Sequence, residues 1–155
     1  MANADHVARL RQGSEVWNAW RVSNPAVEPD LREANLRGAT LDLADLQDAD
    51  LRTAFLSDAE LDSADLRRAK LDDADLRQAN LFGANLQGAT LRRANLRFAN
   101  LLDVDLSDAD LTGAFVYGAS VWKLTLSPAT TRPVRSWTGA PMQRTPGWCS
   151  PSSMA

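Results

Sequence analysis

The chain has 155 residues with 45% apolar and 24% charged side chains and a formal net charge of −3, values that are ordinary for one soluble domain. A single cysteine, Cys149, excludes an internal disulfide framework and a cysteine-based zinc cage. The first residues lack the apolar run of a signal peptide and no stretch is long enough to span a membrane, so we expect a cytoplasmic protein.

Residues 1–28 have the pattern of a helical N-terminal cap. Gly13 is a typical helix stop, and Ser14 is a typical N-cap residue for a second short helix. That helix should end at Asn24, because the residue before Pro25 is biased away from helical geometry. We expect its apolar residues to cover the end of the domain that follows; they are Val16, Trp17 and Trp20.

Residues 29–128 repeat with a period of five. Central positions from Leu31 to Leu126 define twenty repeats; eighteen of them have leucine at the centre, and most have alanine two places earlier. The exceptions are Val116 and Val121 at the centre and Pro29, Val104 and Leu124 at the alanine position. Leucines five apart would wander around a helix, and an odd spacing would alternate the faces of a straight strand. The chain must therefore bend once per repeat and coil.

The units ANLRG, ANLFG and ANLQG resemble those of the pentapeptide-repeat proteins, and the resemblance covers about 100 of the 155 residues. The segment SEVWNAWR is also similar to a short helical leader in some members of that family. The resemblance implies an all-β fold, a right-handed, four-sided β-helix with one repeat per side. Twenty repeats then make five coils, which would extend for roughly 24 Å at the usual strand spacing.

In the expected coil, residues twenty apart lie over one another, so the residues on each side can be read from the sequence. Acidic residues gather on one half of this coil. On the two sides centred on Leu41, Leu46 and their stacked equivalents, nine acidic residues face three basic ones. The candidate acidic face consists of Asp42, Asp45, Glu60, Asp62, Asp65, Asp103 and Asp105. One interpretation is that these charges only keep a repetitive protein soluble. The other is that they meet a basic surface that normally holds DNA.

A second outward feature is the candidate aromatic patch, defined as Phe82, Phe98, Leu102, Phe115, Tyr117 and Trp122. Exposed aromatic residues in a cluster typically mark a contact surface. Residues 129–155 follow as a Pro/Ser-rich tail without periodicity, which we expect to be disordered in isolation. In one interpretation this tail, with Trp137 and Trp148, folds back over the patch. In the other, the patch serves self-association or a partner.

The sequence offers no pattern typical of catalysis or of a cofactor or metal site. His6 is interpreted as a solvated helix residue, and Cys149 has no histidine near it in the sequence. The aspartates lack calcium-loop spacing, and no glycine-rich phosphate loop follows a strand. Carboxylates on convex sides also lack a cleft that would shift their pKa values. We therefore expect a protein that is not an enzyme and takes no cofactor.

Two functions follow. The first is a non-catalytic binding or scaffold module that presents a rigid, patterned surface to a protein partner of unknown identity, or to a second copy in a homodimer. The second is implied by the family resemblance, because some pentapeptide-repeat proteins bind type II topoisomerases such as gyrase in place of DNA and protect them from inhibitors. Neither hypothesis involves direct binding to nucleic acid or to a membrane.

Overall fold

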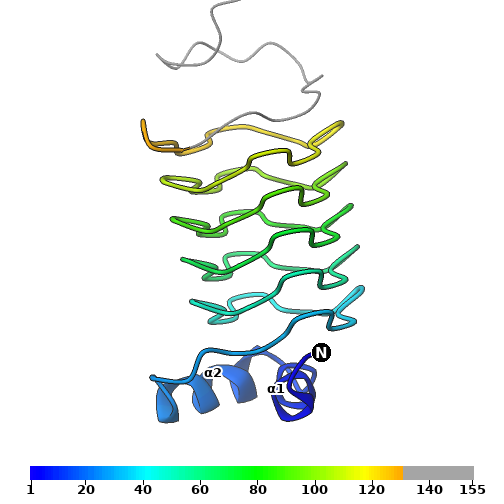
Figure 1. The fold of residues 1–155 in the computed structure, drawn as a ribbon, viewed down its shortest axis with the longest axis vertical. Coiled ribbons are helices and arrows are strands. Elements are labelled where there is room, and N and C mark those ends of the chain that lie inside the picture. Colours follow the sequence, from blue (N-terminus) through cyan, green and yellow to red (C-terminus); the bar gives the residue numbers. More distant parts are fainter. Residues whose placement is uncertain (131–155) are drawn as a thin grey trace, which may run out of the picture.

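The computed structural model describes residues 1–130, which form a stack of coils with two helices across one end (Figure 1). Helix α1 spans Ala4–Leu10 and helix α2 spans Ser14–Ser23. The coils pair through parallel bridges between residues twenty apart, from Asp30 with Asp50 to Asp105 with Thr125. In this part of the chain the β-structure consists of these single bridges and has no extended strands. All but two residues of the tail expected over 129–155 lie outside the described residues.

Each coil contains four repeats and therefore has four sides. Side 1 is centred on Leu31, Leu51, Leu71, Leu91 and Leu111, and side 2 on Leu36, Leu56, Leu76, Leu96 and Val116. Side 3 is centred on Leu41, Leu61, Leu81, Leu101 and Val121, and side 4 on Leu46, Leu66, Leu86, Leu106 and Leu126. Residues with the same place in successive coils form columns that run along the stack.

A tight turn makes each corner. In the first turn the Ala34 N–H donates to the Leu31 carbonyl at 3.1 Å, and Glu33, just before Ala34, has a φ of 61°. The third residue of the turn has a positive φ at every fifth position from Glu33 to Lys123. This is the signature of a type II turn, which favours glycine, asparagine or aspartate at that place. Glycine or aspartate does occupy it in about half of the repeats.

Where Asp or Asn precedes the central residue, its side chain supports the same turn. The Asp30 carboxylate accepts a hydrogen bond from the Arg32 N–H at 3.3 Å, and the Asn85 amide oxygen accepts one from the Gln87 N–H at 3.0 Å. Asp and Asn side chains commonly bond the backbone two residues on in this way. The motif A(D/N)L thus encodes a buried alanine, a turn-stabilising oxygen and a buried leucine.

The core is a column of alanine and leucine inside the coils. The central leucines from Leu31 to Leu106 have 0–3% of their surface exposed, and almost all of the alanines beside them are equally buried. A small side chain is favoured beside leucine in so thin a coil, although Val104 is also fully buried at this place. Burying one leucine is worth about 1.5–3 kcal/mol before the entropy of ordering is subtracted. In the last coil Val121, Leu124 and Leu126 are only partly buried, because no described coil covers them.

The two helices satisfy backbone groups of the first coil that have no preceding coil to pair with. On side 1, the Asn3 N–H donates to the Asp30 carbonyl at 3.0 Å, and the Asp30 N–H donates to His6 Nδ1 at 3.0 Å. On side 2, Arg11 Nη2 donates to the Asn35 carbonyl at 2.8 Å. Buried polar backbone groups are costly when unpaired, so these bonds explain why polar side chains lie at this contact.

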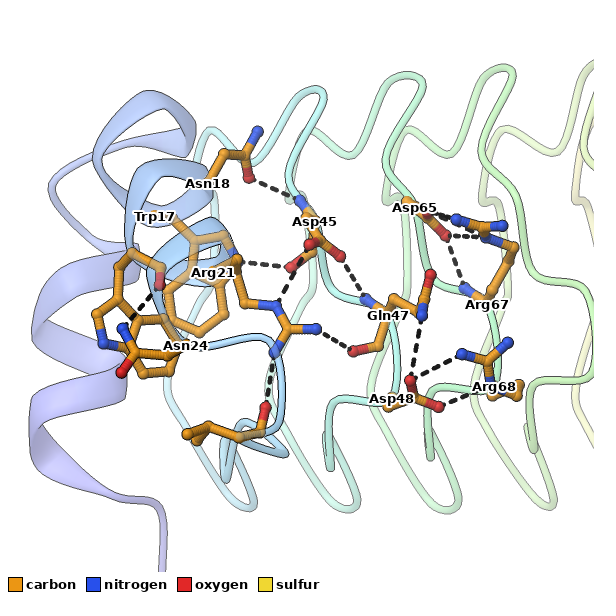
Figure 2. A network of polar contacts seen from close by, with 12 residues as sticks. Trp17, Asn18, Arg21, Asn24, Asp45, Gln47, Asp48, Asp65, Arg67 and Arg68 are labelled. Atoms are coloured by element: carbon orange, nitrogen blue, oxygen red, sulfur yellow. Dashed lines mark hydrogen bonds and ion pairs between the residues drawn. The ribbon is translucent and has the colours of Figure 1, made fainter.

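Side 4 has the most extensive cap (Figure 2). Trp17 Nε1 donates to the Asp45 carbonyl at 2.7 Å, and the Asp45 N–H donates to Asn18 Oδ1 at 2.8 Å. Buried Arg21 donates to the Gln47 carbonyl at 3.0 Å, and its Nε makes a 3.4 Å ion-pair contact with Asp45 that lacks hydrogen-bond geometry. Side chains of α2 therefore take the hydrogen-bonding place of a missing strand.

In the N-terminal segment, His6 and Val16 differ from what the sequence predicts. His6 is buried and packs against Trp20 with a centroid separation of 4.9 Å and tilted rings, so it is a structural side chain and not a solvated one. Trp17 is fully buried and Trp20 is partly buried against the core, whereas Val16 keeps 43% of its surface exposed.

Candidate functional site

Ion pairs neutralise much of sides 1, 2 and 4. Arginines pair with aspartates of their own repeat, as in Arg32 with Asp30 and Arg77 with Asp75, or with those of a neighbouring coil, as in Arg68 with Asp48. The hydrogen bonds from Arg32 lower the pKa of Asp30 to about 2. Other aspartates whose pKa is lowered chiefly by an arginine hydrogen bond are Asp48, Asp73 and Asp75.

Several members of the candidate acidic face also have structural partners. Asp45, Asp65 and Asp105 each accept the backbone N–H of the residue two places on. Asp65 also pairs with Arg67, and Asp103 lies 3.7 Å from Lys123. The acidic face is therefore less charged than its composition indicates.

Side 3 differs from the other three sides because it has no arginine. Its first two coils carry Asp42, Glu60 and Asp62, and within residues 1–130 none of these three has a cationic partner. Asp42 accepts the Asp62 N–H at 2.9 Å, whereas Glu60 is exposed. Carboxylates without a cationic partner thus lie together at the N-terminal half of side 3; on side 4, Asp105 and Asp108 also lack an ion pair within the described residues.

The middle of side 3 is a ladder of uncharged amides. Asn100 Nδ2 donates to Asn80 Oδ1 at 2.9 Å, and Asn80 Nδ2 donates to the Glu60 carboxylate at 2.9 Å. Ser120 continues the column. Each side chain is held by the coil next to it, so the ladder gives side 3 a fixed, neutral centre line.

Apolar residues flank this ladder in the C-terminal half. At the far corner of side 3, Phe82 and Trp122 are 42% and 57% exposed, with half-buried Leu102 between them. At the corner shared with side 2, Phe98 and Tyr117 are 58% and 50% exposed. Five of the six residues of the aromatic patch therefore border one side of the stack.

Phe98 and Tyr117 are positioned by packing between coils. Their rings meet edge-to-face with centroids 5.7 Å apart, a preferred aromatic geometry. The Phe98 ring also lies over Gly118, where an added Cβ would come within 2.5 Å of two ring carbons. Gly118 therefore makes room for the ring, and Phe98 is fixed although it is exposed.

Phe115, the sixth residue of the aromatic patch, lies on side 2 under a cation. The Arg97 guanidinium is 5.0 Å from its ring centroid, and Phe115 is only partly exposed. Three coils away in the same sequence column, Arg37 covers Phe55 in the same way at 5.1 Å. Side 2 thus repeats one cation–π arrangement, which makes Phe55 a useful comparison residue.

Within residues 1–130, no group of three or more His, Cys, Asp or Glu side chains is placed to hold a metal ion. Neither helix in this part of the chain has the length and apolar character needed to cross a membrane. Cys149 lies outside the described residues.

Sequence comparison assigns the family. Residues 28–58, 59–97 and 89–121 match the family profile described as Pentapeptide repeats, with eight copies. The chain is a pentapeptide-repeat protein. Members of this family fold as right-handed quadrilateral β-helices, and they are generally structural and non-catalytic. A comparison with curated protein sequences gave no match.

Solved structures of other pentapeptide-repeat proteins are similar to this one. HetL of Nostoc sp. strain PCC 7120, a protein involved in the regulation of heterocyst differentiation, is 32% identical with a TM-score of 0.51. The match covers 65% of this pentapeptide-repeat protein and 44% of HetL, so the chain spans less than half of that relative. The protein alr5209 of Nostoc PCC 7120 is 28% identical, with a TM-score of 0.41 and 73% and 94% of the two chains covered. QnrB1, a plasmid-mediated fluoroquinolone resistance protein, is 24% identical, with a TM-score of 0.29 and 57% and 55% covered.

Proposed function

We propose that this pentapeptide-repeat protein is a non-catalytic binding module that presents the C-terminal half of side 3 to a protein partner. The observation that carries the proposal is the exposure of Phe82, Phe98, Tyr117 and Trp122 around the neutral amide ladder. Large exposed aromatic side chains that border one surface favour a contact role, because each loses water-exposed apolar area when a partner covers it.

The backbone under these residues supports a preformed surface. Coil-to-coil hydrogen bonds hold the backbone of the patch. The Phe98 N–H donates to the Tyr117 carbonyl at 3.0 Å, and the Asp103 N–H donates to the Trp122 carbonyl at 2.9 Å. A surface that is already ordered loses little conformational entropy on binding. The patch therefore suits a rigid docking face.

The test compares Trp122→Asp with Phe55→Asp, a matched change at an aromatic residue 41% exposed on side 2. We expect Trp122→Asp to abolish capture of the partner by the full chain from the native host, with an unchanged circular dichroism spectrum. Phe55→Asp should leave capture intact. Equal capture by both variants would refute the assignment of the surface. If Trp122→Asp instead loses the circular dichroism spectrum of the folded protein, this residue is structural.

The same variants decide whether the partner is a second copy of the chain. If the patch forms a homodimer, the unmodified protein sediments as a dimer and Trp122→Asp sediments as a monomer. A monomer in both cases would exclude a homodimer through the patch.

A second proposed function is binding to a type II topoisomerase in place of DNA. The carboxylates of Asp42, Glu60 and Asp62, which have no cationic partner within residues 1–130, favour it, because they would face the basic surface that normally contacts DNA phosphates. Inhibition of gyrase supercoiling by micromolar protein, lost in Asp42→Asn with Asp62→Asn and retained in Asp75→Asn, is the expected result. No inhibition, and no protection from a quinolone, would refute this function.

A further inference from the structure

At the bridge position of side 3, the first coil lacks the backbone hydrogen bonds that the N-terminal segment makes at the bridge positions of its other three sides. The four bridge positions of this coil are Asp30, Asn35, Thr40 and Asp45. The N-terminal segment bonds the backbone of three of them, as described above. At Thr40, neither the N–H nor the carbonyl has a partner within residues 1–130. An exposed edge of this kind is a template for pairing with another strand.

A cavity of about 460 Å³ lies next to that edge, between the turn that joins α1 to α2 and the first coil. Leu10, Leu36 and Leu41 lie beneath it with at most 1% of their surface exposed, so backbone and polar side chains form most of its accessible lining. Its volume falls within the range of about 300–1,000 Å³ that is usual for ligand sites. Thr40 itself lines the cavity, so its unpaired backbone groups are next to space that a ligand can occupy.

Charged residues in and beside the cavity favour one orientation of a bound strand. Arg11 and Arg37 line it, and no carboxylate does. Arg11 Nη2 bonds the Asn35 carbonyl, so its other N–H groups stay available to a ligand. Asp42 lies beyond Thr40 along the chain, on the side away from Arg37. A strand that runs parallel to the first coil would therefore meet cations with its first residues and a carboxylate with its last.

We propose that this cavity binds an extended peptide segment of another protein as one additional parallel strand on side 3. The Thr40 N–H would donate to one peptide carbonyl, and the Thr40 carbonyl would accept the peptide N–H two residues later, as Glu60 does with Ala39 and Leu41 in the coil above. The preferred segment has acidic residues first, small and apolar residues in the middle, and a basic or neutral residue last. This is strand addition to a sheet edge with charge-selected polarity. The site is separate from the aromatic patch and does not depend on its function.

The experiment uses the full chain and a fluorescein-labelled peptide, acetyl-EDATLK, whose ATL unit copies the repeat. We expect saturable binding by fluorescence anisotropy. Methylation of the peptide nitrogen of its leucine removes the hydrogen bond to the Thr40 carbonyl, so it should weaken binding at least tenfold while leaving the protein unchanged. A peptide with its charges exchanged, acetyl-KKATLE, should weaken it by a similar factor.

A matched pair of protein variants locates the site. Arg37→Glu should weaken binding at least about tenfold, whereas Arg97→Glu, which alters the same cation–π arrangement far from the cavity, should leave it unchanged. The proposal is overturned if the peptide fails to saturate at millimolar concentration, if the methylated peptide binds equally well, or if the two arginine variants have the same effect. Because the aromatic patch is intact throughout, these results leave the test with Trp122→Asp independent.

Discussion

The role of α2 as a substitute strand makes a quantitative prediction at Trp17. Trp17→Phe keeps an aromatic ring but removes the indole N–H that donates to the Asp45 carbonyl at 2.7 Å. Leaving a buried acceptor unpaired costs about 1–3 kcal/mol. The smaller ring also leaves part of a fully buried site unfilled, which adds about 1 kcal/mol. We therefore expect a loss of about 2–4 kcal/mol in the free energy of unfolding of the capped end.

The matched control is Trp20→Phe. Trp20 is partly buried, packs against Trp17 with ring centroids 5.0 Å apart, and makes no hydrogen bond through its indole nitrogen to any described residue. Its replacement should cost less than about 1 kcal/mol, the usual value of an aromatic contact.

Hydrogen exchange measured residue by residue is the suitable assay, because a repeat protein can open from one end without unfolding throughout. Trp17→Phe should accelerate exchange of the Asp45 N–H, which donates to Asn18, and leave the Asn95 N–H in the fourth coil unchanged. Equal effects of the two tryptophan variants, or no change at Asp45, would refute the reasoning.

Three further predictions test the coil, its charges and its patch. Leu76→Ala, at a fully buried central position, should cost about 2.7–5 kcal/mol in urea unfolding; a cost below 1 kcal/mol would contradict a close-packed core. The lowered pKa of Asp30, about 2 in the folded protein, contributes stability that is present above pH 4 and is lost as the pH falls towards 2, so the urea midpoint should drop over that interval, and an unchanged midpoint would contradict the pairing of Asp30 with Arg32. Gly118→Ala should shift the NMR signals of the Phe98 ring, whereas Gly38→Ala, where an added Cβ meets nothing within 4 Å, should not; identical spectra for Phe98 in both would show that the ring is not held there.

The repeat period carried most of the information about the fold. Leucine and alanine at fixed places, from Leu31 to Leu126, predict a chain that coils, and the family resemblance implies that residues twenty apart stack; the parallel bridges have that register. Core packing in a thin coil depends on residue size, which a single sequence displays directly. The family comparison confirmed the recognition of the pentapeptide repeat.

The polar contacts were less accessible from sequence. Asp45 and Asp65 were interpreted as surface charges, but their oxygens also hold turns, a role that depends on backbone geometry. His6 was interpreted as solvated, because nothing in the sequence indicates that α1 lies against the Asp30 N–H. Asn18 and Arg21 follow Trp17 on one helix, and this clustering of donors and acceptors beside a buried tryptophan is the signal that would have revealed a capping surface.

The sequence grouped six residues into the aromatic patch, and the structure distinguishes among them. Phe82, Phe98, Tyr117 and Trp122 are well exposed around side 3, whereas Phe115 is covered by an arginine. Cation–π pairing across repeats depends on side-chain direction, which the column position alone does not give. The contact role of these residues remains the proposal made above.

The central claim is that this rigid coil meets another protein through side 3, and site-specific photo-crosslinking tests it most directly. A benzophenone amino acid replaces Phe82 in one variant and Phe55 in another, each expressed as the full chain in the native host. Both positions have 41–42% of their surface exposed, so access to the reagent is matched. The account predicts one discrete crosslinked species from position 82 and none from position 55. Crosslinks from position 55 alone, or the same species from both, would contradict it.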